Sequence, residues 1–313
     1  MAALIPDDID FSEYERETDC KAKVRPASVF SDELDAAFTP RTSGQRRSTM
    51  RSTNLRNAIE FRPGEVSVWA GYNGHRKSMF TGQVAMDMCA DDQPTLVMSL
   101  EMPPRETLKR MCMQACAVEI PRVDDRRAFM RWTDGRLWLF DHVGGLTPSK
   151  CMAVCRYFAE KHSGAHVFID SFMKVCASEE SMDAQKAMVG DLCDVAKETG
   201  LHLHLIAHCR KPSGGAEDKP PTKYDIKGSG AITDQPHNVL LIWDNKPKRA
   251  EFEKPPEKQD PKYHDQHDAV ITLDKQRNGR VEGRFGMWFD DASLRFCDYR
   301  GANPEPMFDV ESA

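Results

Sequence analysis

The 313-residue chain lacks a long apolar run. No stretch approaches the about 20 apolar residues that a helix needs to cross a bilayer. The start of the chain, Ile5-Pro-Asp-Asp-Ile-Asp10, is polar and acidic, unlike a secretory signal peptide. The sequence therefore predicts a soluble, cytoplasmic protein.

The chain also lacks a surplus of basic residues, since its formal net charge is −6 and its isoelectric point is about 6.0. This charge gives no support for a wholesale affinity for nucleic acid, so any DNA contact must come from a local basic patch. At this length and 40% hydrophobic content we expect one large domain plus an arm.

The chain has ten cysteines, but a cytosolic protein is not expected to form disulfides. Cys112 and Cys116, like Cys151 and Cys155, are four residues apart in a predicted helix and so share one face. Zinc binding is an alternative, but neither pair has a second pair at ligand spacing. We interpret all four as buried core thiols.

A phosphate-binding loop is the strongest motif. Val66–Ala70 reads as a strand that runs into a glycine-bearing turn ending in Lys77-Ser78. In such a loop the backbone N–H groups face phosphate, the lysine sits near the β and γ oxygens, and the serine hydroxyl ligates Mg²⁺. The expected nucleotide-binding residues are Gly71, Tyr72, Asn73, Gly74, His75, Arg76, Lys77 and Ser78.

The loop departs from the pattern G-x-x-x-x-G-K-[ST] at one position, because Arg76 stands where the second glycine is expected. Either the local φ suits an L-residue or the loop is distorted. An ordinary strand–turn–helix junction with a chance Lys-Ser pair is the competing interpretation.

Alternating apolar runs and amphipathic stretches predict an α/β fold, with a mostly parallel, twisted sheet flanked by helices and antiparallel strands at the C-terminal end. We expect residues 1–60 to form an arm or linker, residues 61–299 the domain and residues 300–313 a frayed tail. The predicted strands are Val66–Ala70, Thr95–Leu100, Leu137–Phe140, His166–Ile169, His202–Ala207, Asn238–Trp243, Ala269–Asp274, Arg284–Phe289 and Leu294–Cys297. The predicted helices are Ser78–Cys89, Pro104–Ala117, Pro148–Lys161 and Ala184–Thr199, and a Pro/Lys/Glu-rich insertion spans Lys246–Gln266.

Two carboxylates follow the loop in an informative order. Glu101 in Ser99-Leu-Glu-Met-Pro103 ends the second strand, where it can polarise a water for attack on a γ-phosphate. Asp170 ends the apolar strand that begins at His166, as expected of a carboxylate in the Mg²⁺ shell. A capping or solvated acid would explain either residue alone.

A further strand ends in His208, followed by Arg210 and Lys211. His208 there can sense a γ-phosphate, or merely satisfy a buried backbone group. The polar segment 213–230 comes next and is too long for a plain connector. Its end, with Lys227, Gly228 and Gly230, suits the phosphates of a DNA single strand, and an inert excursion is the alternative.

Near the end of the domain, Lys275 and Arg277 alternate outward from a strand end in Asp274-Lys-Gln-Arg-Asn-Gly279. In a ring of subunits they can reach a neighbour's nucleotide as a trans arginine finger. A charged hairpin turn is the simpler interpretation.

This ordered series resembles the RecA-like ATPase domain of DnaB-like replicative hexameric helicases and their phage and mitochondrial relatives, over roughly Phe61 to Tyr299. Ser99–Pro103 is the most specific match, and Lys227-Gly-Ser-Gly-Ala-Ile232 resembles the end of the family's central DNA-binding loop. The resemblance implies ATP and Mg²⁺ as cofactors, Ser78 and Asp170 as metal ligands, and Glu101, Asp170, His208 and Arg277 as catalytic residues.

The same resemblance implies single-stranded DNA, a hexameric ring of identical subunits, and a primase, polymerase or helicase loader as partners. It implies 5′-to-3′ translocation, and a bacterial or phage-infected cell as the setting. The Ser31–Phe38 patch is a candidate for packing on a neighbour, with a disordered leader as the alternative, and we expect no primase module before the domain. The rivals are a RecA/RadA-type recombinase and a DNA-binding protein whose nucleotide site has decayed through Arg76.

Overall fold

The computed structural model describes residues 3–5, 27–38, 48–175, 181–212, 214, 217–228 and 230–309. Most of the basic run Arg41–Arg51 and four positions of the polar segment, 213, 215, 216 and 229, lie outside this set. The last predicted tail residues, 310–313, do so as well.

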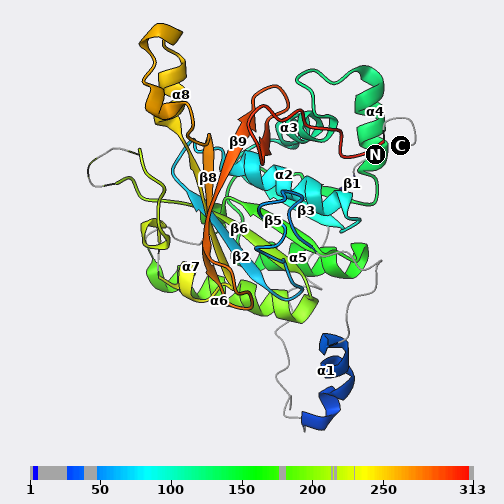
Figure 1. The fold of residues 1–313 in the computed structure, drawn as a ribbon. Coiled ribbons are helices and arrows are strands. Elements are labelled where there is room, and N and C mark those ends of the chain that lie inside the picture. Colours follow the sequence, from blue (N-terminus) through cyan, green and yellow to red (C-terminus); the bar gives the residue numbers. More distant parts are fainter. Residues whose placement is uncertain are drawn as a thin grey trace.

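A single ten-stranded sheet organises the described residues, in the order β1-β4-β3-β5-β6-β2-β7-β8-β9-β10 (Figure 1). The strands from β1 to β7 are parallel, and β8, β9 and β10 are added antiparallel. The strand bounds are β1 Ala3–Ile5, β2 Val66–Gly71, β3 Thr95–Ser99, β4 Leu137–Phe140, β5 His166–Asp170, β6 His202–His208, β7 Asn238–Asp244, β8 Ala269–Gln276, β9 Gly283–Asp290 and β10 Arg295–Cys297. The predicted fold class is confirmed.

Helices cover both faces of the sheet (Figure 1). The α-helices are α1 Ser31–Phe38, α2 Lys77–Ala90, α3 Pro104–Cys116, α4 Val123–Trp132, α5 Pro148–His162, α6 Met182–Thr199, α7 Ala231–Asp234 and α8 Lys246–Phe252. Short 3₁₀ turns are η2 Ala27–Phe30, η3 Phe172–Lys174, η4 Lys223–Asp225, η5 Pro256–Lys258 and η6 Pro261–Tyr263. The sequence analysis missed α4 and α7, and the predicted insertion after β7 contains α8, η5 and η6.

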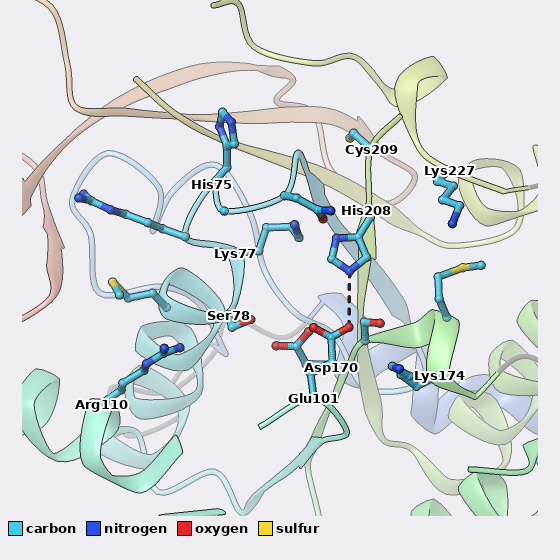
Figure 2. Close-up of a pocket in the computed structure, with 16 residues that line it drawn as sticks. His75, Lys77, Ser78, Glu101, Arg110, Asp170, Lys174, His208, Cys209 and Lys227 are labelled. Atoms are coloured by element: carbon cyan, nitrogen blue, oxygen red, sulfur yellow. Dashed lines mark ion pairs between the residues drawn. The ribbon is translucent and has the colours of Figure 1, made fainter. Parts of the chain in front are cut away.

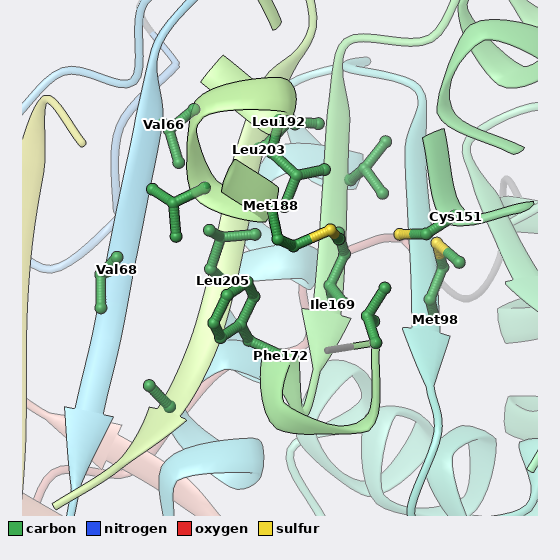
Figure 3. Close-up of a cluster of buried hydrophobic side chains, with 14 of the residues drawn as sticks. Val66, Val68, Met98, Cys151, Ile169, Phe172, Met188, Leu192, Leu203 and Leu205 are labelled. Carbon is green, nitrogen blue, oxygen red and sulfur yellow. The ribbon is translucent and has the colours of Figure 1, made fainter. Parts of the chain in front are cut away.

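Strand periodicity divides the core between the two faces. In β2, Val66, Val68 and Ala70 pack under α5 and α6, whereas Trp69 points to the opposite face, under α2, α3 and α4. Figure 3 shows the first cluster, in which Met188 of α6 lies over the apolar side chains of the central strands. Buried parallel strands are apolar on both faces, as the sequence pattern predicted. The four helical cysteines also lie in these clusters, as predicted.

The packed unit extends beyond the expected domain bounds at both ends. Met50, Leu55 and Ile59, which we assigned to the arm, are buried in the core cluster under α2. Near the other end, Phe308 stacks on Trp132 with ring centroids 5.1 Å apart, so this part of the tail is not frayed. Strand β1, also in the expected arm, pairs in parallel with β4. Residues 48–60 and 307–308 add buried side chains at irregular spacing to a core built by other elements, so no helix or strand period marks them.

Three buried histidines form a polar cluster in β5 and β6. His166 Nδ1 lies 3.2 Å from His204 Nε2, and His204 Nδ1 accepts from Trp69 Nε1 at 3.1 Å. His202 Nε2 lies 2.8 Å from Ser67 Oγ. Burial lowers the pKa of all three imidazoles, to about 3 for His166. They are therefore neutral in the folded protein.

We predict that acid destabilises the fold through this cluster. The unfolded chain takes up protons on these imidazoles below their ordinary pKa of 6.5 and the folded chain does not, so stability falls as pH falls. Burial raises the pKa of Asp87 to about 7, which opposes the effect of about one histidine. These four groups together should lower the free energy of unfolding by about 2 kcal/mol between pH 7 and pH 5.5, measured as a lower urea midpoint. A midpoint that stays constant or rises would contradict this account.

Candidate active site

The phosphate loop joins β2 to α2, as predicted. The loop begins where β2 and β7 are closest, since a Cβ on Gly71 would lie 2.3 Å from the carbonyl oxygen of Ile242. Lys77 opens α2, and its buried Nζ donates to the carbonyl oxygen of Tyr72 at 2.8 Å. Burial lowers the pKa of Lys77, an effect that nearby Asp170 opposes. The loop thus surrounds an ammonium group at a helix N-terminus, which is a cradle for phosphate.

Arg76 adopts a backbone conformation in which glycine is favoured. Its φ is 57° and its ψ 24°, in the left-handed region. Its guanidinium carbon lies 3.7 Å from the centroid of the Phe289 ring. Ion pairs of 3.6 Å join it to Asp244 and to Asp291. The loop keeps its shape because these contacts offset a backbone strain of about 1–2 kcal/mol.

Glu101 and Asp170 follow neighbouring strands. β3 and β5 are in register with Ser99 opposite Asp170, so both carboxylates lie at the same edge as the loop. Burial raises the pKa of Asp170, and the Ser78 hydroxyl opposes this rise. The His208 imidazole, with Nε2 3.6 Å from Glu101 Oε1, is the largest cause that lowers the pKa of Glu101 to about 2. Glu101 is therefore an ionised acceptor at neutral pH.

These groups line one pocket of about 720 Å³ (Figure 2). The picture shows Lys77, Ser78, Glu101, Asp170 and His208 directed toward one another, with the His208–Glu101 pair marked. The loop residues Asn73, Gly74, His75 and Arg76 also line this pocket. A hydroxyl and a carboxylate are oxygen ligands of the kind Mg²⁺ prefers, so Ser78 and Asp170 fit that ion.

Two predicted loop residues do not line the pocket. Gly71 shapes the turn, and the Tyr72 side chain is buried in the core, where it meets the His75 ring edge-on at 5.3 Å. Conversely, Arg110 and Lys174 line the pocket and were not predicted. Arg110 lies in α3, the helix that follows Glu101 in the chain. The sequence around Arg110 and Lys174 contains no motif that would have predicted their place in the pocket.

The candidate DNA-binding residues lie beside the end of β6. Arg210 Nη2 donates to the carbonyl oxygen of Gly228 at 3.1 Å. The backbone N–H of Lys227 donates to the carbonyl oxygen of His208 at 2.7 Å. The Lys227 side chain also lines the nucleotide pocket, which was not expected. Gly228 has a φ of +118° that favours glycine. Lys211 and Gly230 are exposed.

Lys275 and Arg277 lie away from this pocket. β8 runs antiparallel to β7 and places Gln276 opposite Asn238, at the edge where β2 begins rather than where it ends. Lys275 Nζ donates to the carbonyl oxygens of Thr233 and Asp234 at 2.8 and 2.7 Å. The pair cannot serve the nucleotide site of its own subunit.

The fold and the loop place the chain in the class of α/β folds with RecA-like, P-loop architecture. The family model for the DnaB-like helicase C-terminal domain matches residues 53–298, and the chain belongs to this family. The predicted resemblance is confirmed.

Two curated relatives are replicative DNA helicases DnaB. The protein of Buchnera aphidicola subsp. Schizaphis graminum is 23% identical over 263 residues, which is 76% of this chain and 52% of that protein. The protein of Haemophilus influenzae is 22% identical over 247 residues, 71% of this chain and 49% of that protein. The chain thus spans about half the length of these relatives.

Two solved structures share the fold. The ATPase domain of G40P superposes with a TM-score of 0.64 at 16% identity, covering 77% of this chain and 86% of that chain. A DnaB-like replicative helicase, described with its interactions with primase, gives a TM-score of 0.62 at 16% identity, covering 77% of this chain and 58% of that chain.

No helix among the described residues is long and apolar enough to span a membrane.

A matched pair of substitutions tests the account of Arg76. Arg76→Ala removes the guanidinium contacts and keeps the strained φ, whereas Arg76→Gly removes the contacts and the strain together. We expect Arg76→Ala to lower the free energy of unfolding by about 2 kcal/mol, and Arg76→Gly by about 1 kcal/mol less than that. Urea unfolding measures both values. Equal stabilities of the two variants would show that the left-handed conformation is not retained.

Proposed function

We propose that this chain is the ATPase motor of a replicative DNA helicase, which hydrolyses ATP to move 5′ to 3′ along single-stranded DNA and unwind the duplex. The observation that carries the proposal is the convergence of Lys77, Ser78, Glu101, Asp170 and His208 on one pocket. The family assignment and the likeness to helicase ATPase domains support it.

Each residue has a chemical task in this proposal. Lys77 binds the β- and γ-phosphate oxygens with the backbone N–H groups of the loop. Glu101, which its low pKa keeps ionised at neutral pH, accepts a hydrogen bond from the attacking water and aligns it in line with the γ-phosphate. Mg²⁺, when bound by Ser78 and Asp170, neutralises phosphate charge.

His208 is suited to report the γ-phosphate. Its ring lies beside Glu101, and its backbone carbonyl accepts from Lys227 in the candidate DNA-binding residues. A shift of His208 on hydrolysis therefore moves both the water-positioning carboxylate and the start of a DNA contact. Lys227, Gly228 and Gly230, with Arg210 and Lys211 nearby, hold the DNA backbone in this proposal.

A ring of subunits supplies the remaining cation. Because Arg277 is remote from its own pocket, it completes a neighbour's site, and Lys275 assists it. Helix α1 carries Leu34 and Phe38 on one face, 58% and 80% exposed, and stands away from the sheet (Figure 1). It is a candidate to pack on the adjacent subunit. The mass of the protein in solution with nucleotide tests the ring.

Two observations weigh against the rival functions. The nucleotide site has not lost its shape through Arg76, since the residue holds the left-handed conformation and Lys77 keeps its place. The matched family is that of DnaB-like helicases rather than of recombinases. DNA-stimulated ATPase activity separates the motor from a decayed site, and electron microscopy separates closed rings from filaments.

Glu101→Gln should retain ATP binding and lose hydrolysis. The amide keeps the shape of the side chain but is a poor acceptor for the water proton, so we expect turnover to fall by ~10³-fold or more. ATPase assays and equilibrium nucleotide binding measure the two effects. Glu106→Gln, at an exposed position of α3, is the matched control and should be fully active. Retained turnover in Glu101→Gln would remove the assigned water-positioning role.

Arg277→Ala should also lose turnover by ~10³-fold or more while its own pocket still binds ATP. Arg280→Ala, at an exposed position three residues further on, is the control. Mixing Arg277→Ala with Glu101→Gln subunits creates interfaces that combine an intact Glu101 with an intact Arg277. ATPase activity should reappear in the mixture. A mixture as inactive as its components would exclude the trans role.

A further inference from the structure

The imidazole of His75, within the phosphate loop, is held at both nitrogens. The backbone N–H of Asp244 donates to His75 Nδ1 at 3.1 Å, so this nitrogen carries no proton. The proton must be on Nε2, which donates to Glu217 Oε2 at 2.9 Å. Burial lowers the pKa of His75 and favours this neutral tautomer, although the bond to Glu217 opposes the shift. His75 is fully buried, so its ring cannot move without the loop.

Glu217 belongs to the polar segment 213–230 and has a second link to the loop. Its Oε2 accepts from Lys246 Nζ at 3.0 Å, and the same ammonium donates to the carbonyl oxygen of Asn73 at 3.0 Å. The Trp243 indole donates to the Glu217 carbonyl oxygen at 2.9 Å and fixes the backbone there. Glu217 thus connects to two loop residues, directly to His75 and through Lys246 to Asn73.

The far end of the polar segment meets the same site. Ile226 pairs with Cys209 beyond the end of β6, and the next residue, Lys227, bonds to the carbonyl oxygen of His208. Figure 2 shows the Lys227 side chain beside His208 at the rim of the pocket. The segment is therefore attached to the nucleotide site near both of its ends, on the phosphate loop by Glu217 and on the γ-phosphate side by Lys227.

We propose that Glu217 is a positioning residue that couples the phosphate loop to the polar segment, so that nucleotide binding orders the segment and DNA on the segment alters nucleotide affinity. The first part rests on the contacts of Glu217, and the second part rests on the proposed function. Phosphate binding requires the loop to hold its N–H groups in one arrangement, and Asn73 and His75 pass that constraint to Glu217. Coupling between two binding sites is reciprocal, so each ligand must change the affinity of the other by the same factor.

Hydrogen exchange on the full chain tests the first part without DNA. Addition of Mg-ATP should slow exchange of the backbone amides of both the phosphate loop and residues 217–228, by about 5-fold or more in the segment. Glu217→Ala should keep protection of the loop and lose that of the segment. Asp218→Ala, a matched loss of one carboxylate at the exposed neighbouring position, should behave as the unaltered protein.

If Glu217→Ala does not fold, Lys246→Met breaks the link through Asn73 and leaves the bond from His75 to Glu217, so a partial loss of segment protection is expected. Segment protection that persists undiminished in Glu217→Ala or in Lys246→Met overturns the proposal.

Linkage between the two ligands tests the second part. The dissociation constant for Mg-ATP, measured with and without oligo-dT, should differ by about 5-fold or more in the unaltered protein and by less than about 2-fold in Glu217→Ala. An unaltered protein that shows no DNA binding and no stimulation of ATPase activity contradicts the proposed function. Normal linkage in both the unaltered protein and Glu217→Ala contradicts the coupling role of Glu217 and leaves the function standing.

Discussion

The parallel arrangement of β3, β5, β6 and β2 is the constraint on which the rest depends. Parallel strands end at one edge, so side chains that follow them meet there although they are far apart in the sequence. Glu101 and Asp170 are neighbours because Ser99 and Asp170 are opposite each other in register. A one-residue slip of either strand would turn its final side chain to the other face. The apolar core on both faces holds that register. The packing of the core therefore also fixes the positions of the side chains in the pocket.

The site also shows how a local rule is broken and repaired. Glycine is expected at position 76 because the chain there must be left-handed, and the structure confirms that conformation for an arginine. The repair comes from β7, from β9 and from the β9–β10 turn, which supply Asp244, Phe289 and Asp291 respectively. The long side chain that replaces glycine therefore connects the phosphate loop to the C-terminal strands. A smaller side chain other than glycine at this position would have the strain without the contacts.

The sequence predicted elements well where a single segment carries the signal. Apolar runs located the central strands, and the strand-ending acids located the carboxylates of the pocket. Prediction from the sequence failed where the position of a residue depends on contacts with residues far away in the sequence. Residues 48–60 bury Met50 and Leu55 without periodicity, and Arg110 enters the pocket through the path of α3. The glycines beside Lys227 led us to predict a DNA contact for its side chain. Its place at the nucleotide pocket follows instead from the pairing of Ile226 with Cys209, which the sequence does not reveal.

The antiparallel strands explain how one chain can both hold and complete a nucleotide site. Reversal of direction at β8 carries Lys275 and Arg277 to the edge opposite the pocket. A cation at that edge is useless to its own phosphates and available to those of another subunit. The polar segment has the opposite property, because Glu217 and Lys227 keep it on the nucleotide edge of its own subunit. In the proposed ring, interfaces between subunits therefore control hydrolysis, while contacts within a subunit link the nucleotide to the candidate DNA-binding residues. The proposed motor needs both kinds of link, and the reversal of strand direction at β8 is sufficient to separate them.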